Sequence, residues 1–181
     1  MAAPIAEEKV YTGVRVTLRA GLDGARIPVQ VDVGFGDAVT PEPQSVDYPV
    51  LLDAPAPRLR AYPVETVIAE KLHAMIVLGL NNSRMKDFYD LKVIGARFTL
   101  EREALARALA ATFDRRKTAL PEGLPVALGP EFANDEGKQH QWAAFLLRNR
   151  LDDKKYSLVD YQAAIARLVL PALKLARDRR Q

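Results

Sequence analysis

The chain has 181 residues, 49% of them hydrophobic and 27% charged, with a net charge of +3 and no cysteine. This composition is typical of a globular protein of about one domain, and it excludes wholesale disorder, disulfides and cysteine zinc sites. The chain has no apolar run near the ~20 residues that span a bilayer and no secretory signal at its N-terminus, so we expect a cytoplasmic protein without a membrane segment. The positive charge permits an anionic ligand such as RNA or a nucleotide without requiring one.

Two alternating segments near the N-terminus predict an antiparallel β-hairpin. Residues 14–18 and 27–33 each alternate apolar and polar side chains, the period of a half-buried strand. Pro28 places its part of the second strand at an edge or at the strand's start. The second strand continues through Asp32 into a glycine-containing segment that ends at Asp37. Asp32 is either a carboxylate held on the sheet beside a ligand or a residue of the solvated face, and the alternation favours the solvated face.

The rest of the chain predicts a proline-rich connection followed by helices. Residues 38–63 are rich in proline and predict a rigid connection whose one short strand is Val50–Leu52. We predict helices at 63–79, 83–95, 100–113, 136–148 and from Ser157 onward, the last with a kink or restart at Pro171. A small sheet followed by a helical half is an α+β layout, which we divide into residues 1–60 and 61–181.

The first predicted helix carries a lysine within its apolar side. At 100° per residue, Val64, Val67, Ile68, Met75 and Leu78 share one arc, and Lys71 falls in the middle of it. An unpaired ammonium buried there costs several kcal/mol, so it must snorkel, meet an anion or lose its proton. Two interpretations stand: a snorkelling lysine at the end of a core stripe, or a cation directed into a ligand cavity.

The second predicted helix begins with a cluster of charges. We expect the Ser83 hydroxyl to cap it and Gly95 to end it. Asp87 and Asp90 lie three residues apart on one face, with Arg84 and Lys86 just before them. The carboxylates either stabilise the first turn through the helix dipole, at ~0.3–1 kcal/mol each, or point into the cavity that Lys71 enters.

Three blocks in this order carry a family resemblance. They are V-D-V-G-F-G-D at 31–37, Y-P-V-E-T-V-I-A-E-K-L-H-A-M at 62–75 and S-R-M-K-D-F-Y-D-L at 83–91, with T-F-D-R-R at 112–116 and Q-W-A-A-F at 141–145 behind them. From about Tyr11 onward the chain resembles the AbiEii/AbiGii toxin family of nucleotidyltransferases. These are toxins of bacterial abortive-infection and toxin–antitoxin systems that act in phage defence.

The resemblance implies a partial DNA polymerase β-like nucleotidyltransferase sheet followed by a helical half. Such enzymes transfer a nucleoside monophosphate from a nucleoside triphosphate to an acceptor, which in some members is tRNA, and they use Mg²⁺. By motif matching, Asp32 is a metal ligand, Lys71 contacts the nucleotide phosphates, and Asp87 is catalytic with Lys71. The remaining matches assign nucleotide binding to Arg84 and Lys86 and supporting roles to Asp37 and Asp90. The implied protein partner is an antitoxin, of the transcriptional-regulator type.

One part of the family pattern has no counterpart in this sequence. Enzymes of this fold have a Gly-Ser turn and an Asp-x-Asp pair before the strand that Asp32 matches, whereas residues 1–31 contain no Gly-Ser and one aspartate, Asp23. We therefore expect a C-terminal portion of such a toxin, with an exposed sheet edge or face, that is completed by another polypeptide or associates with itself. Since one strand carboxylate is too few for two magnesium ions, enzyme activity of these 181 residues is an open question. The alternative function is a non-catalytic module that binds a partner protein or RNA.

Overall fold

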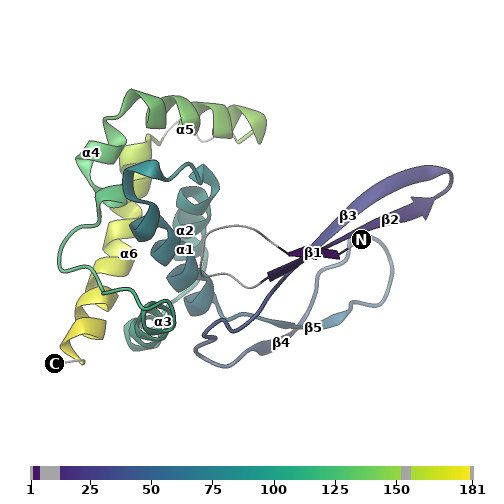
Figure 1. The fold of residues 1–181 in the computed structure, drawn as a ribbon, viewed down its shortest axis with the longest axis horizontal. Helices are drawn as coiled ribbons and strands as arrows, with labels where there is room; N and C mark the ends of the chain where they lie inside the picture. The colour runs from purple at the N-terminus through teal and green to yellow at the C-terminus, as the bar shows by residue number, and fades with distance from the viewer. Residues whose placement is uncertain (1, 5–12, 152–155, 180–181) are drawn as a thin grey trace. The chain divides into compact units, whose positions relative to one another are not determined.

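The computed structural model describes residues 2–4, 13–151 and 156–179 (Figure 1). The chain forms two compact units, residues 1–37 and residues 38–181. The first unit is a small antiparallel sheet, and the second combines a two-stranded sheet with the helices. The predicted α+β class is therefore confirmed, whereas the predicted domain boundary at residues 60/61 stays a prediction.

The first unit contains the predicted hairpin. Strand β2 (Gly13–Leu22) pairs antiparallel with β3 (Ala25–Gly34), and the short β1 (Ala2–Pro4) pairs with the other side of β2. Asp23 and Gly24 form the turn with φ of 45° and 79°, the left-handed region that a tight hairpin turn requires. Within the described sheet β3 is an outer strand, which agrees with the position predicted from Pro28.

The hairpin has one apolar face and one polar face. Because opposite residues of an antiparallel pair project to the same side, the register places Val16 with Val31 and Leu18 with Val29 on one face, and Arg15 with Asp32 on the other. Leu18 is 50% exposed and Val31 45%, so the other described residues of this unit leave much of the apolar face uncovered. An exposed apolar face was expected; its association with another chain stays a prediction.

The second unit opens with a two-stranded sheet that the sequence did not indicate. Strands β4 (Gln44–Asp47) and β5 (Arg58–Ala61) pair antiparallel, with Ser45 opposite Arg60. The predicted strand at Val50–Leu52 is wrong: these residues lie in the loop between β4 and β5, and Leu51 is fully exposed. An apolar triplet between prolines therefore did not mark the strand, and the pairing formed between two short polar segments instead.

The helices follow in chain order. They are α1 (Val64–Leu78), the 3₁₀ turn η1 (Gly79–Asn81), α2 (Met85–Arg97), α3 (Arg102–Arg115), the 3₁₀ turn η2 (Val126–Leu128), α4 (Pro130–Ala133), α5 (Glu136–Arg148) and α6 (Leu158–Asp178). The predictions for α1, α3 and α5 agree with these bounds to within two residues. Ser157 caps α6 as predicted, in a reciprocal capping box with Asp160, and α6 continues through Pro171 without a break in the helix.

Two predicted boundaries of α2 are wrong. The Ser83 hydroxyl does not cap the helix; the side-chain oxygen of buried Asn82 instead accepts the Arg84 amide at 2.9 Å, just before α2 begins. Gly95 does not end the helix, which continues to Arg97. A β-carbon at Gly95 would lie 3.1 Å from Cδ2 of Leu168 on α6, so close packing against α6 explains the glycine there.

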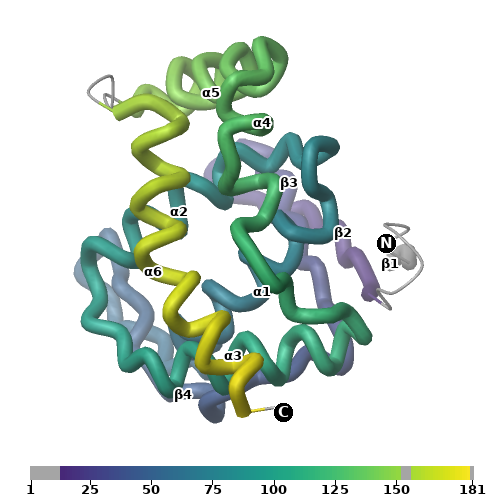
Figure 2. Tube along the Cα trace, turned by 90° about the vertical axis from the view of Figure 1, so that its left-hand side faces the viewer, coloured from purple at the N-terminus to yellow at the C-terminus, as the bar shows by residue number. Residues whose placement is uncertain are grey.

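One hydrophobic core holds the helices together. Helix α6 packs against both α2 and α3, and α1 packs against α3 and α2. Figures 1 and 2 show α6 running along the helical part, with α5 near one end and α3 near the other. The largest fully buried side chains include Phe88 of α2, Phe113 of α3 and Tyr161 of α6. The core therefore fixes α1 and α2, which carry the candidate residues, as neighbours.

Candidate functional site

The buried side of α1 differs from the predicted arc. Its buried residues are Thr66, Ile68, Ala69, Leu72 and Met75, whereas Val67 and Leu78 are half-buried. The burial is displaced because α3 covers the side of α1 that the sequence assigned to solvent. Lys71 therefore lies at the border of the buried side, and not in its middle as predicted.

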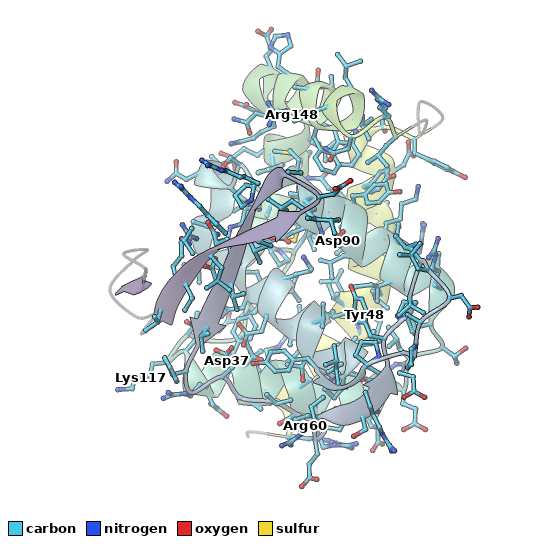
Figure 3. The ribbon with its side chains drawn as sticks, turned by 90° about the vertical axis from the view of Figure 1, so that its right-hand side faces the viewer. Asp37, Tyr48, Arg60, Asp90, Lys117 and Arg148 are labelled. Atoms are coloured by element: carbon cyan, nitrogen blue, oxygen red, sulfur yellow. The ribbon has the colours of Figure 1, made fainter. Side chains whose placement is uncertain are left out.

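Lys71 bridges α1 to the carboxylates of α2. Its Nζ lies 2.5 Å from Oδ1 of Asp87 and 2.8 Å from Oδ2 of Asp90. Lys86 Nζ contacts the same Oδ2 of Asp90 at 2.5 Å, from a side chain that is 71% exposed. The sequence left open whether this lysine snorkels or meets an anion, and the structure places two carboxylates against it. Figure 3 labels Asp90 on α2.

The charges in this cluster stabilise one another. Burial lowers the pKa of Lys71, but hydrogen bonds and charge interactions with Asp87 and Asp90 outweigh it and leave the pKa above its usual range. For Asp90, burial raises the pKa, and the ammonium groups of Lys71 and Lys86 bring it below its usual range. At neutral pH Lys71 is therefore a cation and Asp90 an anion. The site presents a fixed ammonium with its counter-charges in place.

A pocket of about 490 Å³ adjoins this cluster between the start of α2 and the last turns of α5. Arg84, Lys86 and Asp87 line it from the α2 side, and Gln141, Phe145 and Arg148 are among the residues that line it from α5. Two of the predicted nucleotide-binding residues and the predicted catalytic aspartate thus share one cavity.

A buried lysine that the sequence does not single out connects the two walls of the pocket. Lys138 of α5 is 9% exposed, and its Nζ donates to the Asn82 carbonyl at 3.0 Å. The Asn82 side chain in turn accepts the Arg84 amide. This connection joins α5 to the residues that open α2. The sequence carries no clear signal for this role. Lys138 is one of the charged residues in the first turn of a predicted helix, and such residues usually face solvent.

Asp32 and Asp37 belong to the first unit, so their position relative to Lys71 and Asp87 stays a prediction. On β3, Asp32 accepts two hydrogen bonds from Arg15 of β2, at 2.7 and 2.9 Å. The hydrogen bond from Arg15, with its charge, holds the pKa of Asp32 below its usual value. The Asp32 side chain is 41% exposed, which agrees with the solvated-face interpretation.

The sequence of the chain matches one known family over most of its length. Residues 1–167 match the family model described as nucleotidyl transferase AbiEii toxin, type IV toxin–antitoxin system. The chain belongs to the AbiEii family. Membership implies a nucleotide substrate and an antitoxin partner. No curated protein matches the chain. Within its described residues, no helix is long and apolar enough to cross a membrane.

Magnesium is typical of nucleotidyltransferases, and the AbiEii cluster can be tested for it. Mg²⁺ requires carboxylate oxygens that are free to coordinate it. Here Lys71 contacts both Asp87 and Asp90, and Arg15 holds both oxygens of Asp32. Among the described residues, no three His, Asp or Glu side chains gather where they would hold a metal ion. As arranged, these side chains fit an ammonium better than a magnesium ion.

A second polar cluster lies on the other side of α1, where α3 covers it. Arg116 pairs with Glu70 at 2.8 Å, and their side chains are 9% and 21% exposed. His73 Nε2 lies 3.0 Å from the Thr118 hydroxyl, and the His73 ring packs edge-on against Phe113. Burial, and then the charge of Arg116, lower the pKa of His73 from 6.5 to about 4. This cluster explains part of the T-F-D-R-R block as a structural junction between α1 and α3.

His73 predicts how stability depends on pH. Since the folded pKa lies below the unfolded value, the unfolded state binds the proton more tightly, and stability falls as the pH drops from about 6.5 towards 4. Between pH 7 and pH 5 the wild type is expected to lose about 1–2 kcal/mol more unfolding free energy than His73→Gln. Urea unfolding of both proteins at the two pH values measures this difference. The carboxylates are the same in both proteins, so their effect on stability cancels in the comparison. Equal losses of unfolding free energy in the two proteins would therefore contradict the role of His73.

Proposed function

We propose that this AbiEii chain acts in transfer of a nucleoside monophosphate from a nucleoside triphosphate to an RNA acceptor such as tRNA. The transfer is the toxic activity that a cognate antitoxin, of the transcriptional-regulator type, restrains. The proposal assigns the chain to the DNA polymerase β-like fold through its family. The observation that carries it is the contact of Lys71 with Asp87, which joins the two motif residues across α1 and α2 at 2.5 Å.

Lys71 is suited to hold the triphosphate. Phosphoryl-type transfer leaves little covalent work for the protein, so positioning and charge stabilisation carry the rate. The raised pKa of Lys71 keeps it charged, and its side chain is 21% exposed, so a phosphate group can reach it. On binding, the triphosphate replaces carboxylate contacts as the counter-charge of the ammonium.

Asp87 is then freed from part of its ion pair. Its residue is 8% exposed and it also lines the adjoining pocket. A carboxylate between the phosphate-binding lysine and a pocket can accept the proton of an acceptor hydroxyl as that oxygen attacks the α-phosphorus, which breaks the bond from the α-phosphorus to the bridging oxygen and releases pyrophosphate. Asp90 supports this arrangement, because it retains Lys86 as a partner when Lys71 turns to the phosphates.

A specific observation also favours a second function, a non-catalytic module that binds RNA or a partner protein. Lys71 neutralises Asp87 and Asp90 at once, with distances of 2.5 and 2.8 Å. A closed ion-pair network of this kind holds α1 and α2 together and is a sufficient structural reason for these residues. In this function the family's helices are kept for binding, and nucleotide transfer does not occur.

Transfer of labelled nucleotide to a total tRNA pool with magnesium separates the two functions. The assay uses the 181-residue chain and a form extended by any in-frame sequence upstream that encodes an Asp-x-Asp pair. We expect transfer from the extended form and none from residues 1–181, because the family's magnesium ions need that carboxylate pair. Transfer by neither form would favour the binding module. Robust transfer by the shorter chain would show that its own carboxylates are sufficient.

A further inference from the structure

The pocket between α2 and α5 carries more cationic groups than anionic ones. Arg84, Lys86 and Arg148 line it, against one carboxylate, that of Asp87. Asp87 already contacts Lys71, and Lys86 contacts Asp90. Arg84 and Arg148 are exposed, and among the described residues neither forms a salt bridge. Within the described part of the chain, these two guanidinium groups at the pocket therefore pair with no carboxylate.

The other walls suit a nucleotide unit. Gln141 contributes an amide, and Phe145 contributes an apolar ring that stacks on the ring of Trp142, with the two centroids 5.6 Å apart. The volume of about 490 Å³ lies within the range of small-molecule sites. The start of α2 adds the positive end of a helix of thirteen residues.

We infer that this pocket binds a phosphodiester-linked nucleotide of the RNA acceptor, with Arg84 and Arg148 holding its backbone phosphates. Guanidinium groups bind phosphate oxygens in pairs of parallel hydrogen bonds, which gives both affinity and orientation. Asp87 belongs to the pocket wall and also contacts Lys71, so an acceptor held here lies beside the group that handles the triphosphate. The inference rests on the proposed function for the identity of the ligand as RNA.

The arrangement favours RNA over the nucleoside triphosphate or a protein. The two arginines come from separate segments, Arg84 from just before α2 and Arg148 from the end of α5, and they border an open pocket. This arrangement suits a chain of spaced phosphates better than one compact triphosphate. An acidic protein segment would also bind cations, but only a nucleic acid would in addition stack a base on the aromatic ring beside them. Figure 3 labels Arg148 on α5 and shows Arg60, on β5, at the opposite end of the second unit.

Fluorescence anisotropy with labelled tRNA and with a short single-stranded RNA tests the inference. Arg148→Ala and Arg84→Ala are each expected to weaken binding of both RNAs about tenfold. Each is also expected to reduce the slope of log affinity against log salt by about 0.7, the contribution of one phosphate contact to single-stranded nucleic acid. Arg148→Lys keeps the charge but loses the paired hydrogen bonds, so its affinity should fall between wild type and Arg148→Ala. Titration with each nucleoside triphosphate alone should give the same affinity for wild type, Arg148→Ala and Arg148→Lys.

Arg60→Ala is the matched control, because it removes the same charge from an exposed strand. Equal losses of RNA binding in Arg60→Ala and Arg148→Ala would overturn the inference in favour of unspecific charge attraction. A loss of triphosphate binding in Arg148→Ala would assign the pocket to the triphosphate instead of RNA. A loss of antitoxin binding with RNA binding unchanged would assign it to the antitoxin. Circular dichroism confirms that each variant is folded. If the chain binds RNA through these arginines but transfers no nucleotide, the RNA site stands and the proposed catalysis is wrong. If nucleotide transfer is unchanged in both Arg84→Ala and Arg148→Ala, the proposed catalysis stands and the RNA site is wrong.

Discussion

Replacing Lys71 by alanine is expected to lower nucleotide transfer about 100- to 1,000-fold in the form of the toxin that shows it. The ammonium is the group of α1 that meets the carboxylates of α2, and its raised pKa keeps it charged where the phosphates are proposed to bind. Its removal leaves developing negative charge on the phosphates without this counter-charge. Affinity for the nucleoside triphosphate should fall as well, and titration without RNA measures that loss separately.

The variant Lys174→Ala provides the matched control for Lys71→Ala. Lys174 is an exposed residue of α6, so its loss changes the net charge equally without touching α1 or α2. Lys71→Arg keeps the charge in a larger, planar group and should retain part of the triphosphate affinity. If Lys71→Ala transferred nucleotide at the wild-type rate, the ion pairs would be structural only, and the binding-module function would be preferred.

The contact of Lys71 with the α2 aspartates was within reach of the sequence because it is nearly local. Two helices joined by a short connection lie side by side, so residues on their facing sides can be paired from helical spacing alone. The hairpin of residues 13–34 was predictable for the same reason: its alternation and its turn are both local signals. Arg148 was not predictable, since its place at the pocket depends on how α5 packs against residues at the start of α2, which lie far from it in the chain.

The predictions that were wrong concern features that depend on residues far away in the sequence. A helical wheel reports which side of α1 is apolar, but it does not show that polar Thr66 is buried, where its hydroxyl donates to the carbonyl of the distant Thr40 at 2.8 Å. The strands β4 and β5 are short and polar, and they form because they pair with each other. Ser83 has the right chemistry for a cap, yet Asn82 takes the amide next to the helix because Lys138 fixes its backbone.

Phe88→Ala is expected to lower the free energy of unfolding by about 3–5 kcal/mol, a large part of the ~5–15 kcal/mol of a typical domain. Phe88 is fully buried, and its ring stacks on that of Phe132 of α4 with the centroids 5.2 Å apart. Alanine leaves a cavity at the place where α2 meets α4. Chemical unfolding of the variant and the wild type, followed by circular dichroism, measures the loss.

Phe98→Ala is the matched control, since Phe98 directly follows α2 but is 51% exposed, and its loss should stay within about 1 kcal/mol. Phe88 neighbours Asp87 in the chain, so the same residue block supplies both the core side and the charged side of α2. With Phe88 truncated, α2 loses the packing that fixes Asp87 against Lys71, and triphosphate affinity should fall even where the variant remains folded. A folded Phe88→Ala protein with unchanged stability and unchanged triphosphate affinity would show that the charged side of α2 is positioned without this core contact.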